Sequence, residues 1–223
     1  MKNETLQFDT ANGTTTAFVA MPDETNENTR GVVLIQEWWG LNEHIKDIAS
    51  RYAQEGFIAI APDLYRAKLA KNPSEAGEMM KALSTEDGID TIKNAVTKAR
   101  ETYNLNKLGI SGYCMGGTFA LRAACELEDF GAAAPFYGDI PPEDILKNLK
   151  TPTLFIAGEK DAWINPQKVA ELKRIALQYS LPVETISYDA DHAFFNNTRP
   201  EVYDPAASKD AWRRVLELFR NNL

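Results

Sequence analysis

Gly112-Tyr113-Cys114-Met115-Gly116-Gly117 is the stretch of sequence that decides the fold. The apolar run Lys107–Ser111 precedes it, and the helical stretch Met115–Glu126 begins within it. A strand, a tight turn and a helix in this order are the context of a G-x-S-x-G nucleophile elbow, in which a cysteine here replaces the serine. We therefore predict that Cys114 is a nucleophile, exposed on a sharp turn at the start of a helix.

Steric constraints explain why glycine occupies three positions of this stretch. Side chains two residues before and two after the nucleophile would collide in so tight a turn, which explains Gly112 and Gly116, and Gly117 permits close packing of the helix on the strand. A cysteine at a helix N-terminus is favoured as a thiolate. The alternative interpretation is a small buried apolar residue, which is the interpretation we prefer for Cys125, in mid-helix among Ala and Leu.

Outward from this stretch, short apolar runs alternate with amphipathic helical stretches. The apolar runs are Val32–Gln36, Phe57–Ala61, Lys107–Ser111, Ala132–Tyr137, Thr153–Ala157 and Val183–Tyr188. The helical stretches are Glu43–Gln54, Asp87–Thr102, Met115–Glu126, Gln167–Gln178 and Pro205–Asn221. This alternation predicts an α/β fold with a mainly parallel, twisted sheet and helices on both faces. We expect one doubly wound domain over residues 1–223.

Two segments depart from the alternation. An N-terminal β-hairpin is predicted over Leu6–Phe8 and Thr15–Ala20, because Asn12-Gly13 between them tolerates positive φ. The stretch Leu64–Ser84 reads as an excursion over the sheet edge, and it contains a short helix that runs from Ser74, its cap, to Leu83.

Composition limits the possible partners. The net charge is −8 and the pI about 4.9, which disfavours nucleic acid and anionic membranes, since both need clustered Lys and Arg. No apolar run serves as a signal peptide or approaches the ~18 residues of a membrane helix. A cytoplasmic location is therefore expected, and the two cysteines are read as thiols in a reducing compartment.

The chain has two histidines, so the choice of a catalytic base is narrow. His192 follows the last apolar run, where a loop would let it reach across the strand ends to Cys114. His44 lies in the first helical stretch, and we expect a surface or rim residue there. His192 is the predicted base.

A third group should orient the imidazole. Asp161 follows the neighbouring apolar run Thr153–Ala157 and is our candidate. Asp189 and Asp191 compete, but they share a loop with His192 and do not easily face its ring from across the site.

Together these segments resemble the dienelactone hydrolase family, that is, carboxymethylenebutenolidase-like enzymes of the α/β-hydrolase fold. The resemblance covers nearly the whole chain. It rests on Gln36-Glu37-Trp38-Trp39-Gly40, Ala61-Pro62-Asp63-Leu64-Tyr65, Gly112–Gly117, Phe136-Tyr137-Gly138, Gly158-Glu159-Lys160-Asp161 and Asp191-His192-Ala193-Phe194. The order Cys114, Asp161, His192 also matches the order of nucleophile, acid and base in this fold.

The resemblance implies a thiol hydrolase that cleaves a carboxylic ester or lactone through a Cys–His–Asp triad and an acyl-enzyme. It implies that Glu37 pairs with the resting thiol and shifts when substrate arrives, which helps to generate the thiolate. The oxyanion N–H groups are then expected from Trp38 and Met115. The expected substrate is a small ester or lactone.

The sequence departs from the family at the positions that bind the carboxylate of the substrate. Family members hold a substrate carboxylate with arginines, one of them four residues after the catalytic histidine, and Asn196 stands there in this chain. Arg66 and Arg199 are possible substitutes that nothing in the sequence places. A neutral ester or lactone is therefore at least as compatible as an anionic one. Aromatic residues expected to line an apolar pocket are Trp39, Tyr65, Tyr137, Trp163 and Phe194.

Two other classes of function remain open at this point. The first is a non-catalytic ligand-binding protein with the same fold. The second is a redox-responsive thiol protein, which is disfavoured because Cys125 lies roughly 16 Å along a helix from Cys114, too far for a disulfide. No cofactor is expected: two histidines without ligand spacing do not make a zinc site, and no nucleotide motif is present.

Overall fold

The structure is a computed structural model that describes residues 1–26 and 28–223. Its eight strands form one sheet in the order β1-β2-β4-β3-β5-β6-β7-β8. The strands are β1 (Lys2–Thr10), β2 (Gly13–Met21), β3 (Gly31–Ile35), β4 (Ile58–Pro62), β5 (Leu108–Tyr113), β6 (Phe130–Phe136), β7 (Thr153–Gly158) and β8 (Val183–Tyr188). Strand β2 pairs antiparallel with β1 and β4, and the other neighbours are parallel. The predicted mainly parallel sheet is confirmed.

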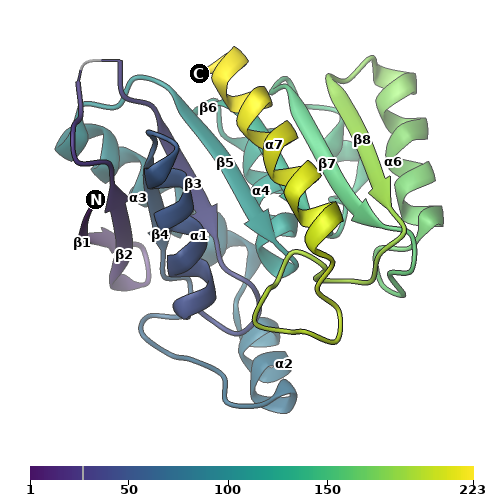
Figure 1. Cartoon of the computed structure of the whole chain (residues 1–223), viewed down its shortest axis with the longest axis horizontal. Helices are drawn as coiled ribbons and strands as arrows, with labels where there is room; N and C mark the ends of the chain where they lie inside the picture. Colours follow the sequence, from purple (N-terminus) through teal and green to yellow (C-terminus); the bar gives the residue numbers. More distant parts are fainter. Residues whose placement is uncertain (27) are drawn as a thin grey trace.

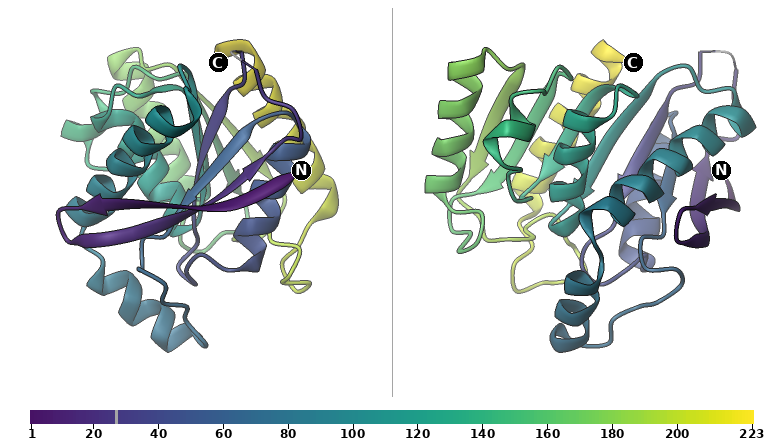
Figure 2. Two further views of the ribbon diagram at one scale, coloured as in Figure 1. Left: turned by 90° about the vertical axis from the view of Figure 1, so that its left-hand side faces the viewer. Right: turned by 180° about the vertical axis from the view of Figure 1, so that it is seen from behind.

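Helices cover both faces of this sheet (Figures 1 and 2). They are α1 (Glu43–Gln54), α2 (Pro73–Ala82), α3 (Thr85–Tyr103), α4 (Met115–Glu126), α5 (Glu143–Leu146), α6 (Pro166–Tyr179) and α7 (Pro205–Asn222). Helices α1 and α7 pack on one face, where their apolar side chains share a core with Val32, Leu34 and Phe136. Helices α3, α4 and α6 pack on the other, around Val33, Ile110 and Phe155.

The continuous apolar runs of the sequence have become the central strands. Every residue of β3, β4, β5 and β7 is buried, because helices lie on both sides of these strands. Strand β1 lies at the edge of the sheet, and its buried residues alternate with exposed ones between Leu6 and Phe8. The runs of the sequence therefore predicted the layers correctly.

The N-terminal hairpin is confirmed, with longer strands than expected. Its last paired residues are Thr10 and Gly13, so the turn consists of Ala11 and Asn12 rather than Asn12 and Gly13. Gly13 has φ +106°, and it is the glycine, as the first residue of β2, that supplies the positive φ.

The excursion after β4 contains α2, but its cap differs from the prediction. The side chain of Asn72 accepts the N–H of Glu75 at 3.0 Å, so Asn72 is the N-cap and Ser74 lies inside the helix. The helix therefore begins at Pro73, earlier in the chain than predicted, because the fixed φ of proline suits the first helical position. The short helix α5 was not predicted, since four residues carry too little periodicity.

The carboxyl ends of the parallel strands meet at one end of the sheet. In Figure 1 the strand arrows point to the end where α2 and the long loop between β8 and α7 lie. Open α/β sheets place their ligand sites at this end. Each helix within the described residues is too short or too polar to cross a bilayer.

Candidate active site

Cys114 occupies the predicted sharp turn between β5 and α4. Its φ is +55° and its ψ −119°, a backbone conformation that L-residues seldom adopt. A Cβ atom on Gly112 would lie 2.1 Å from the carbonyl oxygen of Gly116, so the turn closes only with glycine there. Gly116 itself lies against the end of β3, where its Cβ would be 2.3 Å from the oxygen of Ile35.

Backbone strain also occurs at two neighbouring strand ends. Tyr137, just after β6, has φ +38°, and Ala193, in the loop after β8, has φ +63°. Such conformations persist only where the surrounding structure holds them, and they concentrate at functional sites. Gly117 and Gly138 pass close to each other between these turns, since a Cβ on Gly138 would lie 2.2 Å from the carbonyl carbon of Gly117.

The sulfur of Cys114 is held in its thiol form. Burial and the negative charge of Glu37 raise its pKa to about 12, while the backbone N–H groups of Met115 and Trp38 act in the opposite direction. The helix N-terminus alone favoured a thiolate, but burial and a buried carboxylate outweigh it. The two N–H groups that the resemblance implied for an oxyanion therefore both act on the pKa of this thiol.

His192 and Asp161 form a close pair. Nδ1 of His192 lies 2.6 Å from Oδ2 of Asp161, and only 2% of the Asp161 surface is exposed. Burial acts to raise the pKa of Asp161, but the hydrogen bond and charge of His192 and the backbone N–H groups of Ile164 and Trp163 prevail and lower it. Asp161 is thus an ionised carboxylate that orients the imidazole.

The second oxygen of Asp161 has a separate role. Oδ1 accepts the N–H of Trp163 at 2.8 Å and that of Ile164 at 2.9 Å, so the carboxylate also fixes the turn before α6. The competing carboxylate, Asp189, is exposed and pairs with Lys160 at 3.0 Å. Asp161 is the acid that contacts His192.

Glu37 is buried beside this group, with 2% of its surface exposed. Burial raises its pKa to about 7, against the lowering effects of the charge of His192, a hydrogen bond from Asn196 and the charge of Arg199. The Asn196 bond joins Nδ2 to Glu37 Oε2 at 2.8 Å. The sequence marked Asn196 only as a missing arginine and did not indicate this contact.

The five aromatic residues expected at a pocket lie in different environments. Trp163 is 66% exposed, and its ring centroid lies 5.0 Å from that of His192, edge to face. Tyr137 is fully buried, with its ring 5.0 Å from His192, and Phe194 is fully buried behind it, 5.6 Å from the Tyr137 ring. Phe194 therefore packs in the core below the site rather than on an open wall.

Trp39 and Tyr65 lie at the other side of the elbow. The hydroxyl of Tyr65 donates to the sulfur of Met115 at 3.1 Å, which brings it next to the residue after the nucleophile. Trp39 is half-buried, 5.2 Å from the ring of Trp38, and its carbonyl oxygen accepts the N–H of Ala70. The excursion that contains α2 is thereby attached to the loop after β3.

The two arginines considered as carboxylate ligands both have partners. Arg66 makes two hydrogen bonds to Asp87, at 2.6 and 2.9 Å, and a third to Thr10, so its guanidinium faces α3 and the hairpin. Arg199 pairs with Glu201 at 2.8 Å, and its positive charge also acts to lower the pKa of Glu37.

His44 does not lie at the surface, so this prediction was wrong. It is 3% exposed, and burial, together with the charge of Arg51, lowers its pKa to about 4. It is one of the buried residues of α1, together with Ile45 and Ile48. The sequence could not show this, because a polar residue in the first turn of a helix fits either face.

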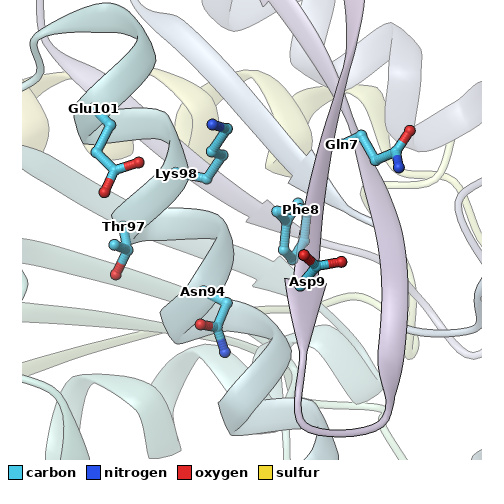
Figure 3. A pocket seen from close by; sticks show the side chains of 7 residues that line it. All are labelled: Gln7, Phe8, Asp9, Asn94, Thr97, Lys98 and Glu101. Atoms are coloured by element: carbon cyan, nitrogen blue, oxygen red, sulfur yellow. The ribbon is translucent and has the colours of Figure 1, made fainter.

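Two surface depressions lie away from these residues. One, of about 230 Å³, lies between β1 and α3 (Figure 3). Its lining residues are Gln7, Phe8, Asp9, Asn94, Thr97, Lys98 and Glu101. The other, of about 340 Å³, lies between α3 and α4. Within the described ranges, no group of three or more His, Cys, Asp or Glu side chains is arranged to hold a metal ion.

The structure thus brings Glu37, Asp161 and His192 to the surroundings of Cys114. Glu37 and Asp161 both raise the pKa of the Cys114 thiol by their charge, and His192 acts on Glu37. Among the described residues, no hydrogen bond joins the sulfur directly to His192, and the groups that lower the pKa of the thiol are the backbone N–H groups of Met115 and Trp38. The group can therefore supply a sulfur nucleophile, an oriented imidazole and a pair of N–H donors.

Comparison with known proteins is consistent with this geometry. The model of the dienelactone hydrolase family matches residues 15–223. A protein of Aquifex aeolicus (strain VF5) with the provisional name carboxymethylenebutenolidase is 35% identical over 204 residues, which are 86% of this chain and 88% of that protein. A Bradyrhizobium protein is 30% identical over 224 residues, 93% of this chain and 89% of its own; it is provisionally named a 2-oxo-3-(5-oxofuran-2-ylidene)propanoate lactonase.

A solved structure agrees over the whole length. The crystal structure of a protein from Klebsiella pneumoniae, provisionally named a dienelactone hydrolase, superposes with a TM-score of 0.92. Its sequence is 27% identical, and the match covers 98% of each chain. The α/β-hydrolase fold expected from the elbow is therefore the fold of this chain.

Proposed function

The chain belongs to the dienelactone hydrolase family, and from this we propose that it hydrolyses a carboxylic ester or lactone with Cys114 as the nucleophile. His192 acts as the base and Asp161 orients it. Glu37 controls the proton of the resting thiol. The residues that stabilise the oxyanion are Trp38 and Met115, through their backbone N–H groups.

One observation carries this proposal. The backbone N–H groups of Trp38 and Met115 both lower the pKa of the Cys114 thiol, so both lie close enough to act on the sulfur. They come from separate segments, the loop after β3 and the start of α4, and they converge on one reactive atom. Two preorganised N–H donors beside a nucleophile are what the oxyanion of acyl transfer requires. A buried structural cysteine needs no such arrangement.

The reaction would proceed in two steps. In the first, the thiol proton passes to His192, the thiolate attacks the carbonyl carbon, and the tetrahedral oxyanion is held by the two N–H groups. Collapse breaks the carbon–oxygen bond, and the leaving oxygen takes the proton from His192. In the second, His192 accepts a proton from water, the hydroxide attacks the thioester, and the acid leaves while the Cys114 thiol is restored.

Asp161 supports both steps in the same way. Its carboxylate accepts the Nδ1 proton of His192, which leaves Nε2 free to accept a proton from thiol or water. It also stabilises the imidazolium that forms for a moment in each step. Because Asp161 is buried, little water screens this interaction.

The surroundings of the site favour a substrate without a negative charge. Glu37 and Asp161 are acidic groups close to the sulfur, and the amide of Asn196 is occupied by Glu37. Arg66 faces Asp87 instead of the elbow. Trp163 offers an exposed apolar surface next to His192. We therefore propose a neutral ester or lactone, although the names of the two relatives refer to lactones that carry a carboxylate.

Turnover of p-nitrophenyl acetate tests the proposal. Cys114→Ala should lower kcat by at least about a thousandfold, while the far-UV circular dichroism stays unchanged. Cys125→Ala is the matched control, since it removes the other thiol, and it should retain wild-type activity. Full activity in the Cys114→Ala variant would exclude the sulfur from the reaction.

A matched pair of substrates tests the charge preference. Mono-p-nitrophenyl succinate and its methyl ester differ by one negative charge at similar size. The neutral ester should show the higher kcat/KM, by about tenfold or more at low ionic strength. Equal values, or a preference for the anion, would refute the proposed class of substrate without affecting the role of Cys114.

A further inference from the structure

Asn196 and Glu37 form a buried contact between two distant segments of the chain. Both residues are 2% exposed, and Asn196 Nδ2 donates to Glu37 Oε2 at 2.8 Å. The bond spans 159 positions of sequence and connects the end of β3 with the loop that carries His192. A hydrogen bond to a buried carboxylate stabilises the charged form more than the neutral one.

The orientation of the Asn196 amide is fixed by its other end. Oδ1 accepts both the N–H of Thr198, at 3.0 Å, and its hydroxyl, at 2.7 Å. If this oxygen exchanged places with the NH₂ group, the N–H of Thr198 would lose its acceptor and two oxygens would face each other at Glu37. The NH₂ group is therefore committed to Glu37.

Other charged and titratable groups face Glu37 from each neighbouring element. They are Cys114 at the elbow, Tyr137 after β6, and His192 and Arg199 in the loop after β8. His192 and Arg199 favour the ionised form of Glu37 through their charge, as Asn196 does through its hydrogen bond, and burial opposes all three. Of these groups, Asn196 is the one in direct hydrogen-bond contact with the carboxylate.

We infer that Asn196 is a positioning residue that holds Glu37 in its ionised form beside Cys114, and so keeps the nucleophile in its thiol form until substrate binds. This inference rests on the proposed function, because it assigns to Glu37 the control of the Cys114 proton. Above the titration of Glu37, the two acidic groups share one proton. It resides on the sulfur when Glu37 is a carboxylate, and on the carboxyl group when the sulfur is a thiolate.

The exchange between these two forms is a single proton transfer. The S–H bond of Cys114 breaks, an O–H bond forms on Glu37, and the negative charge moves from the carboxylate to the sulfur. The Asn196 bond stabilises the form with the charge on Glu37. Without that bond the proton shifts towards Glu37, and a larger share of the molecules contains a thiolate.

Alkylation of Cys114 by iodoacetamide measures that share. The rate is followed over pH 5 to 10 by mass spectrometry of the Cys114 peptide, for the wild type, Asn196→Ser and Asn196→Leu. Serine is too short to reach Glu37 but can still accept the N–H of Thr198, so the loop keeps its turn. Leucine removes both bonds at similar size.

The expected signature is a divergence that depends on pH. At low pH, where Glu37 and Cys114 are both protonated, the thiolate fraction does not depend on the acidity of Glu37, and all three proteins should react at the same rate. Above the titration of Glu37 the variants should react about tenfold faster, and the midpoint of their rate rise should move up by about one pH unit. A loosened loop would instead raise the rate at every pH.

Thr198→Val is the matched control. It removes the hydroxyl bond to Asn196 Oδ1 but leaves the bond to Glu37, so its curve should coincide with that of the wild type. Curves for Asn196→Ser and Asn196→Leu that also coincide with the wild type, or that lie above it by a constant factor, would overturn the inference. The proposed function fails on a different result, the retained ester hydrolysis of Cys114→Ala.

Discussion

Asp161 and His192 contact each other because they follow neighbouring strands. Strands β7 and β8 pair in parallel, with their last residues, Gly158 and Tyr188, opposite each other. Asp161 and His192 each follow one of these strand ends by a few residues. The contact between Oδ2 and Nδ1 is 2.6 Å, and Oδ1 is tied to the backbone of the turn before α6. The backbone before α6 therefore fixes one oxygen of Asp161, and the other oxygen orients the imidazole of His192.

Asp161→Asn should abolish most of the activity and retain the fold. The backbone N–H groups of Trp163 and Ile164 need an acceptor, so the amide oxygen should remain on them and the NH₂ group should face Nδ1 of His192. That nitrogen then has to accept, which places the imidazole proton on Nε2 and blocks its role as a base. We expect kcat to fall by about 10³–10⁴-fold, measured with p-nitrophenyl acetate. Asp189→Asn, on the exposed carboxylate, should have no such effect.

The pH dependence of stability should reveal two opposing buried groups. His44 has a pKa of about 4, below its ordinary 6.5, so the unfolded chain takes up its proton first and stability is lost as the pH falls from 6.5 to 4. Glu37 has a pKa of about 7, above its ordinary 4.5, so the folded chain takes up that proton first and stability is gained as the pH falls from 7 to 4.5.

Single variants should separate these contributions. Between pH 7.5 and pH 5, each group changes the free energy of unfolding by roughly 2 kcal/mol, with opposite signs. As the pH falls from 7.5 to 5, the stability of His44→Gln should rise relative to that of the wild type, and the stability of Glu37→Gln should fall relative to it. Urea unfolding at the two pH values measures both. A His44→Gln variant with the same pH dependence as the wild type would show that the imidazole is not buried in its neutral form.

Gly112→Ala should destabilise the fold through the elbow. The added Cβ would meet backbone, the carbonyl oxygen of Gly116 at 2.1 Å, and backbone cannot move aside as a flexible side chain can. We expect a loss of roughly 2–4 kcal/mol in the free energy of unfolding, together with a loss of activity. Gly77→Ala is the matched control: nothing lies within 4 Å of its Cβ in α2, and it should stabilise the protein by about 0.5–1 kcal/mol. Equal effects of the two changes would contradict the steric explanation.

Local patterns were sufficient for the layers and the elbow. A strand buried on both faces must be apolar along its whole length, so β3, β5 and β7 appeared in the sequence as unbroken runs. The helices α1 and α4 were predicted to the residue, because their apolar positions recur with the helical period. The cap of α2 and the turn of the hairpin were each misplaced by one or two residues, since several polar residues near each end can make the same short-range bond.

The sequence by itself therefore determined the alternation of strands and helices and the sharp turn at Cys114, which its neighbouring glycines allow. Each of these features depends on residues close together in the chain. Only the tertiary structure decided that His44 is buried, that Arg66 pairs with Asp87, and that Asn196 donates to Glu37. These facts depend on which distant surfaces pack together and exclude water. Burial and long-range partners set the charge of a side chain, and they have no counterpart in local sequence.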